Sequence, residues 1–344
     1  MSTFEFTGST MQALVYTAPN RIELHEVARP AAPTGSVRLR VDAVGICGSD
    51  LHAFRGHDPR RNPPLVLGHE FVGTALDTAR AGRRYTANPL VTCGKCRYCG
   101  QGRGNLCSDR SMIGMNLPGA FADELAVPET CLIEVPPTLS DRGAALTEPA
   151  ATVVHALAMV ARASAQPLAQ ARALVLGAGA IGLLATLALQ HRRVPALSVV
   201  ETNALRAAAL RQATGIVAID AQAAAAQAGE FDFVFDAVGV AATRDLAIAG
   251  VAPGGTVAHV GLGEGASALD WRALTLREIT LIGCYTYTTA DLHAAVAALD
   301  RGEFGSLQWV EERTLADGAA AFADLVSGRV GAAKILLRPR GITP

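Results

Sequence analysis

The chain has 344 residues, of which 50% are apolar, 18% charged and 5% aromatic, and its formal net charge is −1. That length suggests two domains with a substantial core, and the near-zero charge argues against a basic nucleic-acid platform. The apolar fraction depends mainly on Ala, Val and Leu, which suits buried parallel strands covered by helices of small residues.

The N-terminal segment from Met1 to Thr10 holds no basic stretch followed by an apolar run, so we expect a loose extension and no signal peptide. The most apolar window, residues 173–189, contains three glycines and is shorter than the ~20 residues of a membrane-spanning helix. Seven cysteines, four of them packed between positions 93 and 107, fit metal ligation in a reducing compartment better than a disulfide framework. We therefore expect a cytoplasmic protein without a membrane partner.

The part of the chain before Ala150 is predicted to be rich in β-structure. Short strand-like runs separated by Pro and Gly occupy Gln12–Tyr16, Arg21–Val27 and Val37–Val44. The sequence GICGSDLH, with Cys47, follows the third run, and GHE, with His69, comes shortly after it. A thiolate and an imidazole could be two ligands of a zinc ion that keeps an open position.

Four cysteines then follow in a C-x2-C-x2-C-x7-C pattern among several glycines: Cys93, Cys96, Cys99 and Cys107. Four thiolates on so short a segment can close a tetrahedral shell around Zn²⁺ and leave no position for substrate, which predicts a structural metal. An iron–sulfur cluster is the alternative, although the spacing lacks the C-P ending of bacterial ferredoxins. Farther along, TEPAAT contains Glu148, a carboxylate that could complete the shell of the other metal.

From about Ala171 onward the pattern changes to alternating strands and helices, which predicts a doubly wound, six-stranded parallel sheet. The expected strands are Ala173–Leu176, Leu197–Glu201, Val217–Asp220, Phe231–Asp236, Gly255–Gly261 and Ile279–Cys284. Helices are expected at Ala204–Thr214 and Ala241–Ala249, and a closing strand at Ala333–Arg338 is expected to return to the first domain.

A glycine-rich turn follows the first of these strands and opens a helix. It reads GAGAIG and comprises Gly177, Ala178, Gly179, Ala180, Ile181 and Gly182. The glycines let the backbone approach a pyrophosphate at the helix N-terminus. Glu201 ends the next expected strand, where a carboxylate accepts hydrogen bonds from the adenosine ribose. This context favours a dinucleotide site over a glycine-rich turn without a ligand.

The ordered series GICGSD, LGHE, four cysteines, TEPAAT and GAGAIG resembles the zinc-dependent medium-chain dehydrogenases, and within them the polyol (sorbitol-type) and threonine-type branch. The resemblance runs from about Met11 to Leu337. It implies an α/β protein in which a GroES-like, β-rich catalytic domain (residues 1–158, with a structural zinc lobe at 90–110, and 299–344) is split by a Rossmann domain (residues 159–298).

The resemblance also implies roles for individual residues. Cys47 and His69 match the catalytic zinc ligands, and Glu70 matches an acid that can itself bind zinc. Glu148 falls at the position of the third ligand. Ser49 and His52 match a proton relay, and Asp50 matches the acid that orients the ligating His. Matches to cofactor-binding positions are Gly177, Gly179, Ala180, Ile181, Gly182, Glu201, Arg206, Val260, Gly261, Leu262, Tyr285 and Thr152.

Two departures from the family pattern bear on the substrate and on the rim of the site. Sorbitol-type enzymes carry an Arg near the position of Thr286, and this chain does not, which weakens a sorbitol assignment. The segment from Ala75 to Asn88 is shorter than the usual loop before the cysteine lobe. Outside the motifs, His57 belongs to a polar segment that could border the cleft between the two domains, where the resemblance implies the active site.

We therefore predict an oxidoreductase that transfers a hydride between a secondary alcohol or polyol, or the matching ketone, and NAD. Two Zn²⁺ ions per chain are expected, one catalytic and one structural. The alternatives are a catalytically silent NAD(H)-binding or sensor protein on the same fold and, among enzymes, a threonine-type 3-dehydrogenase or an NADP-linked alcohol dehydrogenase. The resemblance also implies a homodimer or homotetramer, with Ile279–Tyr285 as the candidate edge between subunits.

Overall fold

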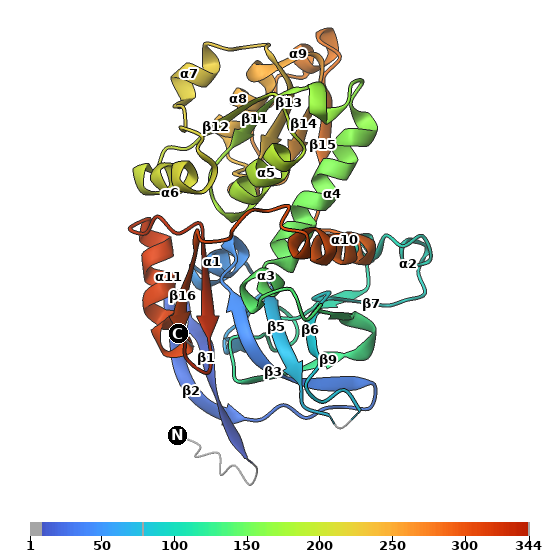
Figure 1. Ribbon diagram of the computed structural model, residues 1–344, viewed down its shortest axis with the longest axis vertical. Coiled ribbons are helices and arrows are strands. Elements are labelled where there is room, and N and C mark those ends of the chain that lie inside the picture. Colours follow the sequence, from blue (N-terminus) through green and yellow to red (C-terminus); the bar gives the residue numbers. More distant parts are fainter. Residues whose placement is uncertain (1–8, 78, 343–344) are drawn as a thin grey trace.

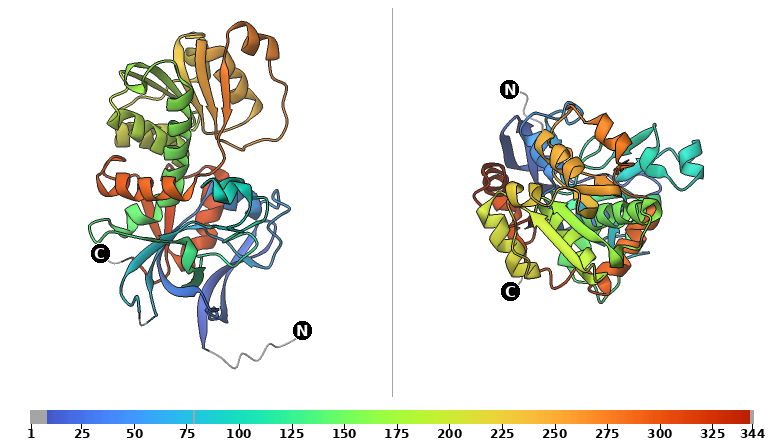
Figure 2. Two further views of the ribbon diagram at one scale, coloured as in Figure 1. Left: turned by 90° about the vertical axis from the view of Figure 1, so that its right-hand side faces the viewer. Right: turned by 90° about the horizontal axis from the view of Figure 1, so that it is seen from above.

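The structure, a computed structural model, describes residues 9–77 and 79–342. It consists of two bodies stacked along the longest axis, the lower built on antiparallel sheets and the upper on a parallel sheet, with α4 and α10 where they meet (Figure 1). The side view of Figure 2 shows the same division. Most of the predicted N-terminal extension, residues 1–8, lies outside the described residues.

The lower body contains the strands predicted at the start of the chain. One three-stranded sheet has the order β2-β1-β4, and the main sheet runs β10-β6-β5-β3-β17-β16 with β9 also paired to β3. Their bounds are β1 Thr10–Ala18, β2 Arg21–Ala28, β3 Ser36–Gly45, β4 Leu65–Val66, β5 Glu70–Ala75, β6 Arg84–Ala87, β9 Glu124–Pro128, β10 Leu132–Glu134, β16 Val310–Thr314 and β17 Lys334–Arg338.

The end of the chain returns to this sheet, as predicted. Strand β17 pairs antiparallel with β3, with Leu336 opposite Gly45, and parallel with β16. A separate two-stranded ribbon, β7 (Leu90–Thr92) with β8 (Arg110–Met112), flanks the cysteine-rich segment. That segment projects sideways from the molecule (Figure 2, right).

The upper body is a parallel sheet with the order β12-β11-β13-β14-β15. Its strands are β11 Arg172–Leu176, β12 Ala196–Val200, β13 Phe231–Asp236, β14 Val251–His259 and β15 Thr280–Gly283. The predicted fold class is confirmed, but the number of strands is corrected from six to five. The expected strand at Val217–Asp220 is reduced to one isolated bridge between Ile219 and Val200, because this short run gives way at once to a helix capped by Asp220.

Eleven α-helices are found among the described residues. They are α1 Gly48–Phe54, α2 Arg97–Gly100, α3 Asp141–Ala145, α4 Thr147–Ala163, α5 Ala180–His191, α6 Ala204–Thr214, α7 Ala221–Ala225, α8 Ala241–Gly250, α9 Trp271–Leu276, α10 Thr289–Asp300 and α11 Gly318–Ser327. The predicted helices α6 and α8 are both present, as is α5, the helix predicted after the glycine-rich turn. The Asn203 side chain caps α6 by accepting from two backbone N–H groups. Within residues 9–77 and 79–342 none of the helices has the length and apolarity needed to cross a bilayer.

Helix α4 joins the cores of the two bodies. Its buried residues, including Ala150, Val153 and Val160, belong to one apolar cluster that reaches Val72 of the lower sheet and Val175 of the upper sheet. A second cluster fills the lower body, and a third covers the opposite face of the parallel sheet. The start of α4 therefore lies where the two bodies meet, and this is where Glu148 is found.

Candidate functional site

The structure brings together Cys47, His69 and Glu70. Cys47 precedes the first turn of α1, directly beyond β3, whereas Glu70 begins β5. Strands β3 and β5 are antiparallel neighbours with Gly45 opposite Glu70, and this pairing brings the two separate sequence motifs together. Ligand atoms of the three side chains all lie within 4.8 Å of one another. Thiolate, imidazole and carboxylate are the donors that zinc uses in proteins, so these residues fit the metal expected here.

Asp50 lies behind His69 and is fully buried. Its Oδ1 is 3.4 Å from His69 Nδ1, and its Oδ2 accepts from the Cys47 backbone N–H at 3.0 Å. Burial lowers the pKa of His69, but the negative charges of Asp50 and Cys47 outweigh it and raise that pKa well above its ordinary value. The pocket thus favours positive charge, and Asp50 directs Nε2 of the ring to the open side.

Glu70 forms a buried ion pair that its sequence motif did not reveal. Lys334 Nζ, from the first residue of β17, donates to Glu70 Oε1 at 2.8 Å and Oε2 at 2.5 Å, and to the Ile46 carbonyl at 2.9 Å. Burial lowers the pKa of Lys334, and the charge of Glu70 outweighs it and raises the value. A signal was available, because Lys334 is one of two lysines in an Arg-rich chain and lies at the start of an apolar strand.

Glu148 lies near this cluster but does not form part of it among the described residues. It sits in the first turn of α4, is buried, and its Oε1 accepts from the Tyr287 hydroxyl at 2.5 Å. Burial raises the pKa of Glu148 to about 7, against the lowering effect of His69. Tyr287 was also missed in the sequence, since nothing in its local pattern distinguishes it from an ordinary core tyrosine.

The two residues of the predicted relay lie on α1. Ser49 Oγ is 3.5 Å from His69 Nε2 and accepts from Arg61 at 3.2 Å, a partly buried contact that the sequence did not reveal. Burial lowers the pKa of His52, as do the charges of His57 and Arg55. No hydrogen bond joins Ser49 to His52 in the described parts of the chain, so the relay stays a prediction. His57 is exposed, with its ring centroid 6.5 Å from that of His52.

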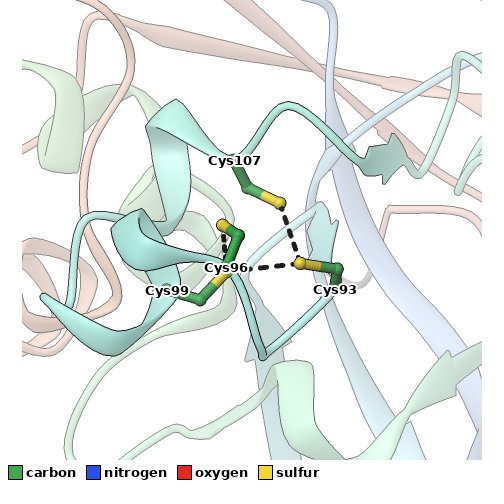
Figure 3. Close-up of side chains that lie close together, drawn as sticks. All are labelled: Cys93, Cys96, Cys99 and Cys107. Carbon is green, nitrogen blue, oxygen red and sulfur yellow. Dashed lines mark hydrogen bonds between the residues drawn. The ribbon is translucent and has the colours of Figure 1, made fainter.

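The four cysteines of the lobe converge as their spacing predicts (Figure 3). Sulfur–sulfur distances are 3.5 Å for Cys96–Cys99 and Cys107–Cys93, and 4.0 Å for Cys93–Cys99. Bonds of about 2.3 Å to a tetrahedral zinc would separate the sulfurs by about 3.8 Å. An iron–sulfur cluster would hold them farther apart because its inorganic core lies between them. The arrangement therefore fits the predicted structural zinc.

The glycine-rich turn has the conformation that a dinucleotide site requires. Gly177 has φ +91°, and a Cβ on Gly182 would overlap the Gly177 carbonyl, so both positions need glycine. Gly179 caps α5, whose first residues are Ala180 and Ile181, and a side chain at Gly179 would meet nothing within 4 Å. Open space beside this helix N-terminus is what a bound pyrophosphate needs.

Glu201 lies just beyond β12, as predicted, and its side chain is only 3% exposed. Its carboxylate accepts from the backbone N–H of Ala178 at 2.9 Å and of Asn203 at 2.7 Å, and pairs with Arg206 at 3.1 Å. Burial raises the pKa of Glu201, but Arg206 and these backbone donors outweigh it and lower the value. The ionised acid thus ties the glycine turn to the start of α6.

The remaining predicted cofactor residues follow neighbouring strands of the parallel sheet or lie on α4. Val260, Gly261 and Leu262 come directly after β14, Tyr285 follows β15, and Thr152 is in the first half of α4. Parallel strands end at the same edge of a sheet, and ligands bind at this edge in open α/β sheets. The structure therefore places Val260 and Tyr285 on the side of the sheet that faces the lower body.

Comparison with known proteins agrees with this arrangement. The family model described as "Alcohol dehydrogenase GroES-like domain" matches residues 33–137, and that described as "Zinc-binding dehydrogenase" matches residues 180–301. L-threonine 3-dehydrogenase of Streptomyces coelicolor is 32% identical over 95% of this chain and 99% of its own. Starvation-sensing protein RspB of Escherichia coli is 35% identical, but the match spans 50% of this chain and 51% of that protein, about half of its length.

Solved structures show the same fold with either nicotinamide cofactor. Acetophenone reductase from Geotrichum candidum, in complex with NAD, has a TM-score of 0.86 at 27% identity, covering 97% of this chain and 98% of its own. A Sinorhizobium meliloti protein described as a zinc-binding dehydrogenase, bound to NADP, has a TM-score of 0.84 at 26% identity, covering 96% and 100%. The chain therefore belongs to the zinc-dependent medium-chain alcohol dehydrogenase family of oxidoreductases.

Proposed function

We propose that this protein oxidises a secondary alcohol or polyol, or reduces the matching ketone, with NAD as the hydride carrier. The observation that carries the proposal is the cluster of Cys47, His69 and Glu70, formed where α1 and β5 begin. When bound there, zinc would polarise the substrate oxygen, and the nicotinamide would take up the hydride from the carbinol carbon.

The side chains of this site would hold the metal and move one proton. Cys47 and His69 would be the anchors, with Asp50 fixing the imidazole, and either Glu70 or Glu148 as the third protein ligand. Ser49, held by Arg61 next to His69, is placed to accept the proton of the substrate hydroxyl. The lowered pKa of His52 favours the neutral imidazole that a proton acceptor needs. Its part in the relay rests on the family resemblance, since no hydrogen bond joins it to Ser49 among the described residues.

The test is a screen of alcohols, polyols and L-threonine with zinc-loaded protein and either NAD or NADP. We expect NADH formation that a chelator abolishes and added zinc restores, and none in Cys47→Ala. L-Threonine belongs in the panel because a relative with that activity matches almost the whole chain. The alternative function is that of a catalytically silent NAD(H)-binding sensor, and one relative is named as a starvation-sensing protein. A protein with this function would bind NADH tightly without turning over any substrate.

We also propose NAD rather than NADP as the cofactor. Glu201 is ionised at the point where the adenosine ribose is expected, and it would repel a 2′-phosphate. Arg206 is already paired with that carboxylate, which reduces its availability for a phosphate. A higher kcat/KM with NAD supports the assignment, and a higher value with NADP contradicts it.

Two zinc ions per chain and a subunit interface complete the proposal. After reconstitution, elemental analysis giving two zinc ions per chain is expected, and one or fewer would contradict it.

For assembly, β15 is the edge strand of the parallel sheet, its residues are alternately exposed, and the neighbouring Trp271 is 70% exposed. Such an edge favours pairing with a second copy. Sedimentation at micromolar concentration is expected to show a dimer or tetramer rather than a species of 35.6 kDa.

A further inference from the structure

Tyr287 has no role in the proton path, yet its hydroxyl contacts Glu148, one of the two acids proposed as the third metal ligand. Its side chain is completely buried, and the hydroxyl donates to Glu148 Oε1 at 2.5 Å. One oxygen of Glu148 is thereby occupied, and within residues 9–77 and 79–342 no side chain hydrogen-bonds to Oε2, the oxygen left for a metal.

The segment that carries Tyr287 is anchored to the four-cysteine lobe. Asn105, which lies between Cys99 and Cys107, donates from Nδ2 to the Tyr285 carbonyl at 2.9 Å. Arg110, which follows the last cysteine of the lobe, donates to the Tyr285 hydroxyl at 3.2 Å and stacks over its ring at 5.2 Å from the centroid. The lobe therefore contacts Tyr285, two positions before Tyr287, and it binds both the backbone and the side chain of Tyr285.

The chain on the other side of Tyr287 is fixed as well. Thr286 has φ +47°, a conformation that a β-branched residue adopts only when its surroundings impose it. Thr288 caps α10 in a capping box with Asp291, whose carboxylate also bonds to His155 Nδ1 of α4 at 2.8 Å. Because Glu148 is on α4, the acid and the phenol are held by the same pair of packed helices.

We infer that Tyr287 is a positioning residue for Glu148, and that the four-cysteine lobe holds Tyr287 in place and thereby sets the metal affinity of the Cys47 site. The inference rests on the metal site of the proposed function and adds a role to a lobe that otherwise only stabilises the fold. A carboxylate already oriented by a hydrogen bond loses less freedom when it binds a metal. Removal of such outer partners typically weakens metal binding about 10–100-fold.

The first test removes only the Tyr287 hydroxyl. In the full-length protein Tyr287→Phe is expected to weaken zinc binding at the Cys47 site about 10–100-fold in chelator competition, while the lobe keeps its metal. Cys47→Ala identifies which of the two ions is lost. With Co²⁺ in place of zinc, the visible spectrum of the Cys47 site should shift, and kcat should fall more than KM changes. Tyr16→Phe removes another buried phenol hydroxyl, from β1, and is the matched control.

The second test breaks the link to the lobe without touching a cysteine. Asn105→Ala is expected to change the affinity and the cobalt spectrum in the same direction as Tyr287→Phe, by a smaller factor, with both metals still loaded in excess zinc. If the protein oxidises no alcohol but these shifts occur, the positioning role stands and only the proposed activity fails. If the wild type is active and both variants match Tyr16→Phe in affinity and spectrum, the positioning role is overturned.

Discussion

The two candidate metal centres of this chain are built in opposite ways. The four-cysteine lobe takes all its donors from one short continuous segment between β7 and β8. The Cys47 site takes its donors from the N-cap of α1 and from the start of β5, and is supported by Lys334 from the closing strand. Glu148, at the start of α4, lies near it. A change in the lobe should therefore act mainly on one local unit and reach the Cys47 site only through the contacts to Tyr285, whereas a change at the Cys47 site should spread through several strands and helices.

The largest expected effect is the loss of the lobe. Cys107 is the buried member of the four, and Cys107→Ser should remove the structural zinc. Structural zinc sites contribute on the order of 10 kcal/mol in small domains, which is comparable to the whole stability of a protein. We expect one zinc fewer per chain and a large fall in melting temperature.

The control for that experiment is Cys131→Ser. Cys131 is also a buried free cysteine but belongs to neither metal-binding group. The Cys131→Ser protein should keep both zinc ions, and its stability should fall only by the modest amount that a substitution of one core residue costs. Equal zinc content and equal melting temperature in wild type and Cys107→Ser would contradict a structural metal.

The next effect concerns the buried pair at the Cys47 site. Lys334→Met leaves Glu70 buried without its cation, and breaking such a pair typically costs about 3–5 kcal/mol. Adding Glu70→Gln should recover much of that free energy of unfolding, because no unpaired charge then remains. Chemical denaturation of the two single variants and the double variant measures the coupling. Additive losses would mean that the two side chains do not depend on each other.

The same contrast explains how much the sequence could predict. The lobe follows from spacing alone, because closely spaced cysteines in a glycine-rich segment have few other ways to fold. The glycine turn with its strand, helix and Glu201 was also predictable, since Gly177 and Gly182 are positions where the backbone tolerates no side chain. In the upper sheet, hydrophobic runs located all five strands, but one short run also predicted a sixth strand that is only a bridge.

The partners within the Cys47 site could not be predicted in this way. Lys334 meets Glu70 across a sequence separation of 264, and Tyr287 meets Glu148 across 139. The closing strand was predicted, but the strand beside which it lies and the packing of α4 against α10 leave no local pattern, and these contacts depend on both. Resemblance named Cys47, His69, Glu70 and Glu148, yet the hydrogen bonds that hold each acid came only from the structure.

A smaller effect is expected from Asp50, which contacts both anchors of the Cys47 site. Asp50→Asn keeps the shape but removes the charge next to His69, so the imidazole loses the partner that fixes its orientation. We expect metal binding at the Cys47 site to weaken about 10–100-fold, with the lobe unaffected. Chelator competition followed by elemental analysis measures this. A loss of zinc from the lobe instead would show that the two centres respond together to a change at Asp50.

The smallest effect concerns the rim of the Cys47 site, where Asp58 holds the buried Arg61 that in turn contacts Ser49. Burial raises the pKa of Asp58, but hydrogen bonds and charges from Arg60 and Arg61 outweigh it and lower the value from 3.8 to about 2. Because the unfolded chain binds this proton more readily, the stabilisation is complete above pH 3.8 and is lost as the pH falls to about 2.

Asp58→Asn should therefore cost about 1.5 kcal/mol near pH 7, since Arg61 loses a charged partner but keeps an oxygen acceptor. Thermal unfolding of both proteins as a function of pH should show the difference shrinking below about pH 4. A difference that stays constant down to about pH 2 would mean that the Asp58 charge does not stabilise this rim.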